Sequence, residues 1–222
     1  MIKKIALLLL LVSNLLSFED DNESLPKAEI DQTGIFMGIG LSSLEYSVTQ
    51  DGFGNNLQNY NKSIEDQNDF AASFLLGYRY YFTRIYARVS TFKYKQDEIK
   101  YTIDGQLIEM NVEYTPIFYR SSENDFNIRG IFGMGVGVNN STISHVYSQA
   151  EYVTDIINSD KTQMFMEYGY QIGALLETST GFSFDILLRS RWGTLLEYEE
   201  AGERLTFVND TKELYIGVNY LF

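Results

Sequence analysis

The residues of this chain that could do chemistry are arginines and carboxylates set at alternate positions within apolar segments. If such a segment is an extended strand, a period of two places its charges together on the face opposite the apolar residues. Charges that face one another away from water must pair, because an unpaired buried charge is strongly unfavourable. We therefore predict a paired charge network comprising Arg79, Arg88, Arg129, Arg189, Arg191, Glu109, Glu113, Glu167, Asp185 and Glu213.

The turns between strands predict which of these charges are neighbours. A turn at residues 178–180 would place Glu167 opposite Arg191. A two-residue turn at 83–84 would place Arg79 opposite Arg88, a like-charge pair that needs carboxylates from other strands, with Glu213 and Asp185 as candidates. Such a network either stabilises a plugged interior or forms a gated, narrow ion path.

Nucleophilic catalysis has one candidate site. His145 is the single histidine, and it lies in a serine-containing segment at 141–148. A serine and a histidine can act as nucleophile and base, but the spacing matches no motif that we recognise and no orienting acid lies nearby. We predict no catalytic residues and no enzyme activity.

Metal and cofactor sites are not predicted either. The chain has no cysteine, which excludes disulfides, thiolate metal sites and a lipoprotein anchor. Acidic residues near position 200 could gather Ca²⁺ or Mg²⁺, but we interpret them as solvated loop charges. These residues are Glu197, Glu199, Glu200 and Glu203. We expect no metal and no cofactor.

The net charge of −13 argues against a nucleic-acid binder, which needs a basic face for phosphates. Residues 1–17 have the pattern of a cleaved signal peptide, since Lys3 and Lys4 precede an apolar run too short to span a membrane. An uncleaved anchor on a soluble periplasmic domain is the alternative. Residues 18–32 carry six acidic residues against Lys27, and we expect a disordered acidic periplasmic lead-in.

Eight segments of alternating polarity follow and predict the elements that must position the charges. They span residues 33–46, 70–82, 85 to a tight turn at Asp104 and Gly105, 106–120, 127–138, 162–178, 182–192 and 211–222. The 17 Tyr and 15 Phe suit strands and membrane interfaces. Short connectors alternate with long polar ones at 47–69, 139–161 and 193–210, which is typical of barrels in membranes.

The predicted fold class is therefore all-β, with residues 33–222 forming a single eight-stranded antiparallel up-and-down transmembrane β-barrel. The first and last strands must pair to close it. Eight strands leave an interior that side chains can nearly fill, which argues against a wide pore. A soluble β-sandwich also alternates and is the alternative fold.

The last strand carries the most specific resemblance. Its outward residues Leu214, Ile216, Val218, Tyr220 and Phe222 resemble the closing strand of bacterial outer-membrane β-barrels. In that family the terminal aromatic is read by the insertion machinery, so the resemblance implies that Tyr220 and Phe222 form an insertion signal. It also implies an outer-membrane location, with membrane lipid, lipopolysaccharide, the insertion machinery and an unknown surface ligand as partners.

By pattern, the whole mature chain resembles the small eight-stranded OmpA/OmpX-like barrels. This resemblance implies a largely filled lumen and a structural or surface-interaction role through the long acidic outer loops. An OmpW-like narrow conduit for small hydrophobic molecules or ions is the alternative, and a continuous apolar cavity through the wall would favour it. A third possibility is an outer-membrane lipid-modifying enzyme, because some small barrels act on lipid A with serine and histidine.

Overall fold

The computed structural model describes residues 33–53, 61–96, 101–121, 126–144, 161–200 and 203–222. The strands are β1 (Gly34–Phe53), β2 (Asn61–Tyr80), β3 (Thr83–Gln96), β4 (Tyr101–Tyr114), β5 (Ile117–Arg120), β6 (Phe126–Ser144), β7 (Lys161–Thr178), β8 (Phe182–Glu200) and β9 (Glu203–Leu221). Within these ranges, no helix is long and apolar enough to cross a membrane. The predicted signal peptide, the acidic lead-in and His145 lie outside the described residues.

The segments β4 and β5 form a single strand of the wall, because both pair with β6. Thr115 and Pro116 separate them. Proline has no N–H to donate to the ladder, so it interrupts the predicted strand 106–120 at this point. The neighbouring backbone still pairs: Gly130 N donates to Pro116 O at 2.9 Å, and Thr115 N donates to Phe82 O at 2.6 Å. Nine segments therefore make an eight-stranded wall.

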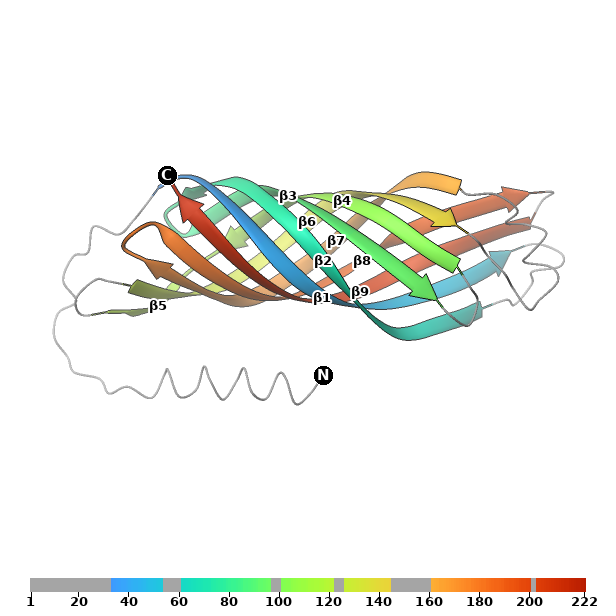
Figure 1. Ribbon diagram of the computed structural model, residues 1–222, viewed down its shortest axis with the longest axis horizontal. Coiled ribbons are helices and arrows are strands. Elements are labelled where there is room, and N and C mark those ends of the chain that lie inside the picture. The colour runs from blue at the N-terminus through green and yellow to red at the C-terminus, as the bar shows by residue number, and fades with distance from the viewer. Residues whose placement is uncertain (1–32, 54–60, 97–100, 122–125, 145–160, 201–202) are drawn as a thin grey trace.

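The sheet closes on itself as an antiparallel barrel (Figure 1). β1 pairs with β9 from Phe36 opposite Leu221 to Phe53 opposite Arg204, and β4 pairs with β6 to complete the circle. The strands run obliquely to the long axis, as closure of a twisted sheet requires. The eight-stranded all-β barrel and its closure by the first and last strands are thus confirmed.

The outside of the wall is apolar and the inside is charged. Side chains such as Leu41 and Met134 point outward with 67% and 70% of their surface exposed. A second apolar set lies inside the barrel, and it comprises Phe36, Leu75, Tyr86, Ile131, Leu175, Leu187 and Tyr215. A continuous exposed apolar belt around buried charges suits lipid and does not suit water. The sandwich alternative is therefore wrong.

Glycines on the inner face make room for long side chains on the neighbouring strand. Gly133 and Gly137 of β6 lie opposite Glu113 and Glu109 of β4. A Cβ added at Gly133 would lie 2.7 Å from Glu113 Cγ, and one at Gly137 would lie 2.9 Å from Glu109 Cγ. The β6 glycines thus give the charges of β4 the space to turn into the lumen.

The turn between β2 and β3 differs from the prediction. Tyr80 pairs with Thr83, so Tyr81 and Phe82 form the turn and Arg79 lies opposite Arg84. The predicted turn at 83–84 and the pairing of Arg79 with Arg88 are wrong. The earlier turn exposes both aromatic rings at the membrane interface, where such rings are favoured, and moves Arg84 into the lumen.

The predicted tight turn at Asp104 and Gly105 is also wrong, because both residues lie within β4. Gly105 faces Phe92 of β3, and a Cβ at position 105 would overlap the Phe92 ring. The absence of a side chain at Gly105 therefore makes room for the Phe92 ring, and this glycine does not form a turn.

The β7–β8 hairpin is shifted by one pair of residues from the predicted register. Glu177 pairs with Ser183, which places Glu167 opposite Gly193 and not opposite Arg191. Its turn contains Gly181, whose φ of 87° is one that glycine adopts readily. Much of the predicted outer loops at 47–69 and 193–210 is paired strand.

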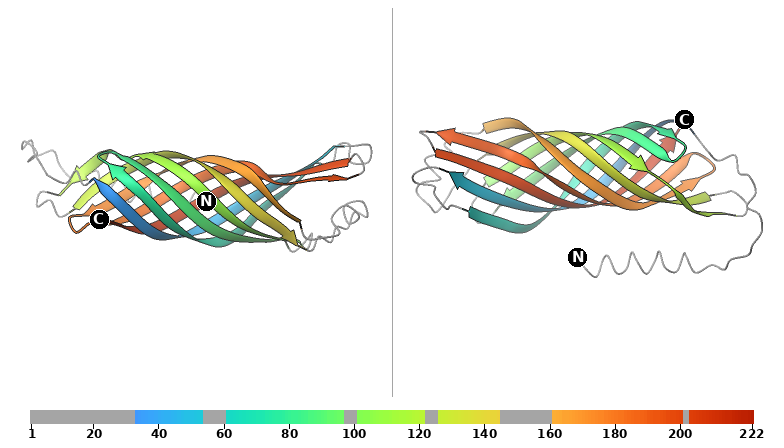
Figure 2. Two further views of the ribbon diagram at one scale, coloured as in Figure 1. Left: turned by 90° about the horizontal axis from the view of Figure 1, so that it is seen from above. Right: turned by 180° about the vertical axis from the view of Figure 1, so that it is seen from behind.

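At the end of the barrel away from the C-terminus (Figure 2), which we call the outer end, the wall separates along two seams. The β2–β3 ladder ends at Ala72 opposite Thr91, and the β7–β8 ladder ends at Glu167 opposite Gly193. Beyond these points β8, β9, β1 and β2 stay paired as a four-stranded leaf, which extends at the end of the barrel away from the C-terminus (Figure 2).

The seam between β7 and β8 is bridged by a side chain. Gln163 Nε2 donates to Glu197 O at 2.8 Å, and Glu197 N donates to Gln163 Oε1 at 2.8 Å. The amide of Gln163 therefore takes the place of a strand partner.

Deletion of Phe222 should impair assembly more than it destabilises the finished barrel. The finished wall loses one hydrogen bond, from Phe222 N to Ile35 O at 2.9 Å, and one ring contact with Tyr220. The measurement is the fraction of heat-modifiable, folded protein in cell envelopes, compared with the urea midpoint of barrels refolded in vitro. Equal losses in both would contradict a role in assembly, and Phe222→Tyr is the control expected to assemble normally.

Candidate functional site

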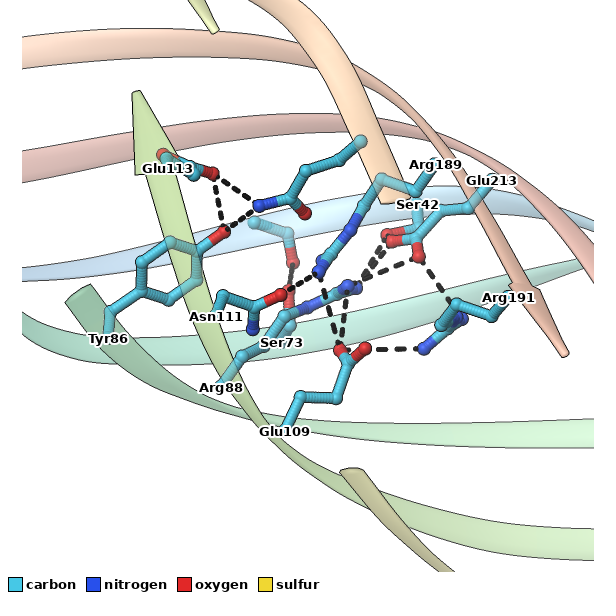
Figure 3. Close-up of polar contacts among 12 residues, drawn as sticks. Ser42, Ser73, Tyr86, Arg88, Glu109, Asn111, Glu113, Arg189, Arg191 and Glu213 are labelled. Atoms are coloured by element: carbon cyan, nitrogen blue, oxygen red, sulfur yellow. Dashed lines mark hydrogen bonds and ion pairs between the residues drawn. The ribbon is translucent and has the colours of Figure 1, made fainter. Parts of the chain in front are cut away.

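The candidate site is the charged interior of the barrel. Six arginines and six carboxylates among the described residues each expose 5% or less of their surface. They include all ten residues of the predicted network, together with Arg84 and Glu177. The interior is therefore balanced in charge. Figure 3 shows its central part.

The cluster nearest the short turns joins two arginines to one carboxylate. Both oxygens of Glu177 accept from Arg79, with Nη2 to Oε2 at 3.0 Å, and Arg129 Nε donates to Glu177 Oε2 at 2.9 Å. Arg129 Nη1 also donates to Thr115 O at 3.2 Å. A two-point contact between guanidinium and carboxylate is among the stronger polar contacts in proteins. Arg79 thus pairs with Glu177, whereas Glu213, one of the two predicted candidate carboxylates, pairs with Arg88.

The next cluster joins one arginine to two carboxylates. Arg84 Nη2 lies 2.5 Å from Glu113 Oε2 and 2.9 Å from Asp185 Oδ2. Glu113 accepts two further hydrogen bonds, from Tyr86 Oη at 2.7 Å and from Gln171 Nε2 at 2.6 Å. These neutral donors stabilise the negative charge that Arg84 does not neutralise.

The third cluster holds three arginines and two carboxylates. Arg88 bonds Glu213 through both terminal nitrogens and reaches Glu109 Oε2 at 3.3 Å. Arg191 lies 3.1 Å from Glu213 and 3.5 Å from Glu109, and Arg189 lies 3.5 Å from Glu109. The two carboxylates therefore link β3, β4, β8 and β9 across the lumen, as the dashed lines in Figure 3 show.

Neighbouring polar and aromatic groups complete the third cluster. Arg189 Nη2 donates to Asn111 Oδ1 at 2.9 Å, and the Ser42 hydroxyl donates to Glu213. The Arg88 guanidinium lies over the Tyr215 ring, 5.2 Å from its centroid, which is cation–π geometry. Strands β1, β3, β4, β8 and β9 thus all contribute side chains to the third cluster.

Glu167 lies apart from the arginines. It accepts from Asn139 Nδ2 at 2.6 Å and from Asn209 Nδ2 at 3.3 Å, and within the described part of the chain no cation pairs with it. The Asn209 oxygen in turn accepts from the Thr211 hydroxyl at 2.9 Å. The predicted pair of Glu167 and Arg191 is therefore wrong, since Arg191 contacts Glu109 and Glu213 instead.

Comparison with solved structures bears on the fold. The chain is similar to Neisserial surface protein A, with a TM-score of 0.55 and 14% identity over 85% of this chain and 97% of that one. It is also similar to the outer membrane protein OprG of Pseudomonas aeruginosa, with a TM-score of 0.51 and 14% identity over 86% and 97%. The chain has the fold of a small outer-membrane β-barrel. No protein-family model matches this barrel, and no curated protein matches its sequence.

The apolar belt and this fold together place the barrel in a bacterial outer membrane. Two residues of the apolar set contact the ionic clusters: Tyr86 Oη donates to Glu113, and the Tyr215 ring lies under the Arg88 guanidinium. Within the described ranges no group of three or more histidines or carboxylates is arranged to hold a metal ion. The arrangement holds strands together across the lumen.

The network predicted from the sequence lacks two of the buried charged residues, Arg84 and Glu177. Arg84 was assigned to a turn, although it continues the alternation of Tyr86 and Arg88. Glu177 lies on the charged face of its segment, next to the predicted turn at 178–180, and the predicted network lacks it. In both cases the alternation continues to within one residue of the end of the strand, and that signal could have found them.

Replacing Arg84 with Met should lower the free energy of unfolding by about 3–5 kcal/mol, because it leaves Glu113 and Asp185 without their cation. The measurement is urea unfolding of the barrel in lipid vesicles. The matched control is Lys93→Met, which breaks the exposed pair with Asp104 and should cost under about 1 kcal/mol.

The double variant Arg84→Met/Asp185→Asn restores the charge balance and should recover part of the loss. A double variant less stable than the sum of its single changes would contradict this account of the interior.

Proposed function

We propose that this protein is a closed outer-membrane barrel that acts structurally or at the cell surface, through its outer end, and not as a pore or an enzyme. The observation that carries the proposal is the interior, where twelve charged residues and an apolar set are buried. A barrel of this size with a filled lumen passes no large solute. Its interaction with other molecules is then confined to its ends and its outer wall.

The outer end supports a surface role. The leaf of β8, β9, β1 and β2 continues beyond both seams, as far as Glu200 opposite Glu203 in the β8–β9 hairpin. This hairpin is acidic, with Glu197, Glu199, Glu200 and Glu203 against Arg204. A long acidic projection suits contact with a basic surface ligand. Outer-membrane lipid, lipopolysaccharide and the barrel-insertion machinery, read through Tyr220 and Phe222, are the further partners that we propose.

A conduit for small hydrophobic molecules fits the interior less well. Such a path needs a continuous apolar cavity through the wall, whereas the described lumen is crossed by arginine–carboxylate bonds from the turn end to Glu109. Catalysis has no support in the described residues, and the one histidine, His145, lies outside them.

Purified protein reconstituted into planar bilayers should show no steady conductance, because Arg88 and Arg191 hold Glu109 and Glu213 across the lumen. The same membrane with a wide porin serves as the positive control. Reproducible unitary currents from the wild-type barrel would overturn the closed-lumen proposal and favour the gated ion path.

Shortening the β8–β9 hairpin should abolish the surface role and spare the barrel. Replacing residues 198–205 with Asn-Gly joins Glu197 to Thr206, which are directly paired, by a favoured two-residue turn. Bacteria carrying this variant should lose most adhesion to basic extracellular-matrix proteins. Adhesion equal to wild type would contradict the proposal, and unchanged heat-modifiable migration and detergent resistance would show that the barrel is intact.

A further inference from the structure

A groove lies on the outer wall beside the open seam between β2 and β3. It has a volume of about 470 Å³, within the range of small-ligand sites. Its lining comes from β2, β3, β4 and β6, and comprises Phe70, Thr91, Phe92, Lys93, Asp104, Gly105, Gln106, Asn140 and Thr142. None of these residues takes part in the ionic clusters of the lumen.

The polar lining forms two cross-strand rows. Thr91, Gln106 and Asn140 are paired directly across β3, β4 and β6. The row above them is Lys93, Asp104 and Thr142, paired in the same way. Lys93 Nζ and Asp104 Oδ1 form an ion pair at 3.2 Å, so this row carries no net charge.

The row directly below the groove is apolar. Val89, Ile108 and Val138 are paired across the same three strands, and 42%, 56% and 44% of their surfaces are exposed. The groove therefore begins where the lipid-facing belt ends on this side of the barrel. This is the depth at which the polar heads of outer-leaflet lipids lie.

The end of the β2–β3 ladder shapes the groove. Beyond Ala72 and Thr91, β2 follows β1 and β3 follows β4, so the two strands are no longer paired with each other. Phe70 projects from β2 beside this seam with 79% of its surface exposed. At this seam an exposed ring therefore lies next to a polar surface that has no net charge.

We propose that this groove binds the sugar headgroup of an outer-leaflet glycolipid, with its acyl chains along Val89, Ile108 and Val138. The inference rests on the proposed presence of the barrel in a lipopolysaccharide-containing membrane. The amides of Gln106 and Asn140 both donate and accept, which matches sugar hydroxyls. The Thr142 hydroxyl bonds Thr162 Oγ1 at 2.7 Å and keeps a lone pair for a further donor. The Phe70 ring offers an apolar surface for the C–H face of a sugar.

Other occupants fit the groove less well. A phosphate needs an excess of positive charge, but Asp104 neutralises Lys93, so the phosphates carried by lipid A would lie outside the groove and only its sugar ring inside. A peptide strand could pair with the open edges of β2 and β3, since unpaired edges invite strand addition. Such a strand would bind through backbone hydrogen bonds, so its binding would not depend on the paired polar rows of the wall or on the apolar row below them.

The test compares lipid A with phosphatidylglycerol, measured by native mass spectrometry of the full barrel in detergent. The variant Gln106→Leu/Asn140→Leu extends the apolar surface without touching the lumen. Lipid A should bind at least about tenfold more weakly to it, since two hydrogen-bonding groups are lost. Phosphatidylglycerol should bind the wild type more weakly than lipid A and should not respond to the change.

The matched control is Lys212→Leu on β9, an exposed outward residue outside the groove, which should bind lipid A like wild type. Heat-modifiable migration verifies the fold of each variant. Unchanged lipid A binding by the double variant, or equal binding of phosphatidylglycerol, would overturn the proposal. So would displacement of lipid A by a short extended peptide, which would assign the seam to strand addition. These outcomes do not depend on conductance or adhesion, so they are separate from the tests of the closed barrel.

Discussion

Charge neutrality inside a narrow lumen is the constraint on which the rest of the structure depends. The six arginines and six carboxylates of the described interior balance, although no single cluster does so. From the turn end outward, the clusters carry an excess of one cation, one anion and one cation, and Glu167 adds one anion. Each excess is next to one of opposite sign, which reduces the cost of burying it.

All the buried cations in the described residues are arginines, and the geometry explains why. A guanidinium can donate to two carboxylates on different strands at once, as Arg84 does to Glu113 and Asp185. It can also stack on a ring, as Arg88 does on Tyr215. The contacts of Arg84 with Asp185 and of Arg88 with Tyr215 join strands that are not neighbours in the wall. The interior therefore links strands that the backbone ladders do not connect. The opposing glycines of β6 provide the space that this requires.

At the outer end of the barrel, unlike in the apolar belt, two pairs of neighbouring strands are no longer hydrogen-bonded to each other. The four-stranded leaf beyond the seams contains none of the buried charges of the lumen. Its two edges have different neighbours. Gln163 bridges the β7–β8 seam, whereas the β2–β3 seam opens beside a groove lined by polar rows. The ion pairs across the lumen, the acidic sequence of the β8–β9 hairpin and the groove support the proposal that this barrel interacts with other molecules at its outer surface.

The alternation of residues by itself determined the fold class, the number of strands and which side chains face the lumen. The predicted register was wrong in both the β2–β3 and the β7–β8 hairpins, yet the predicted faces agree with the structure. Each hairpin was displaced by an even number of residues, and such a shift leaves every side chain on its own face. Sequence reasoning therefore identified ten of the twelve buried charges, but it offered Glu213 only as one of two candidate carboxylates for Arg79 and Arg88.

The partners of these charges were decided only by the tertiary structure. Arg79 of β2 bonds Glu177 of β7, and Arg88 of β3 bonds Glu213 of β9, so each pair spans the lumen and not a shared ladder. Such contacts depend on strand tilt and on the stagger of the closed barrel, which a local pattern does not contain. The break at Pro116, the ring-sized space at Gly105 and the open seam beside Phe70 depend on the same packing, and for the same reason only the folded barrel shows them.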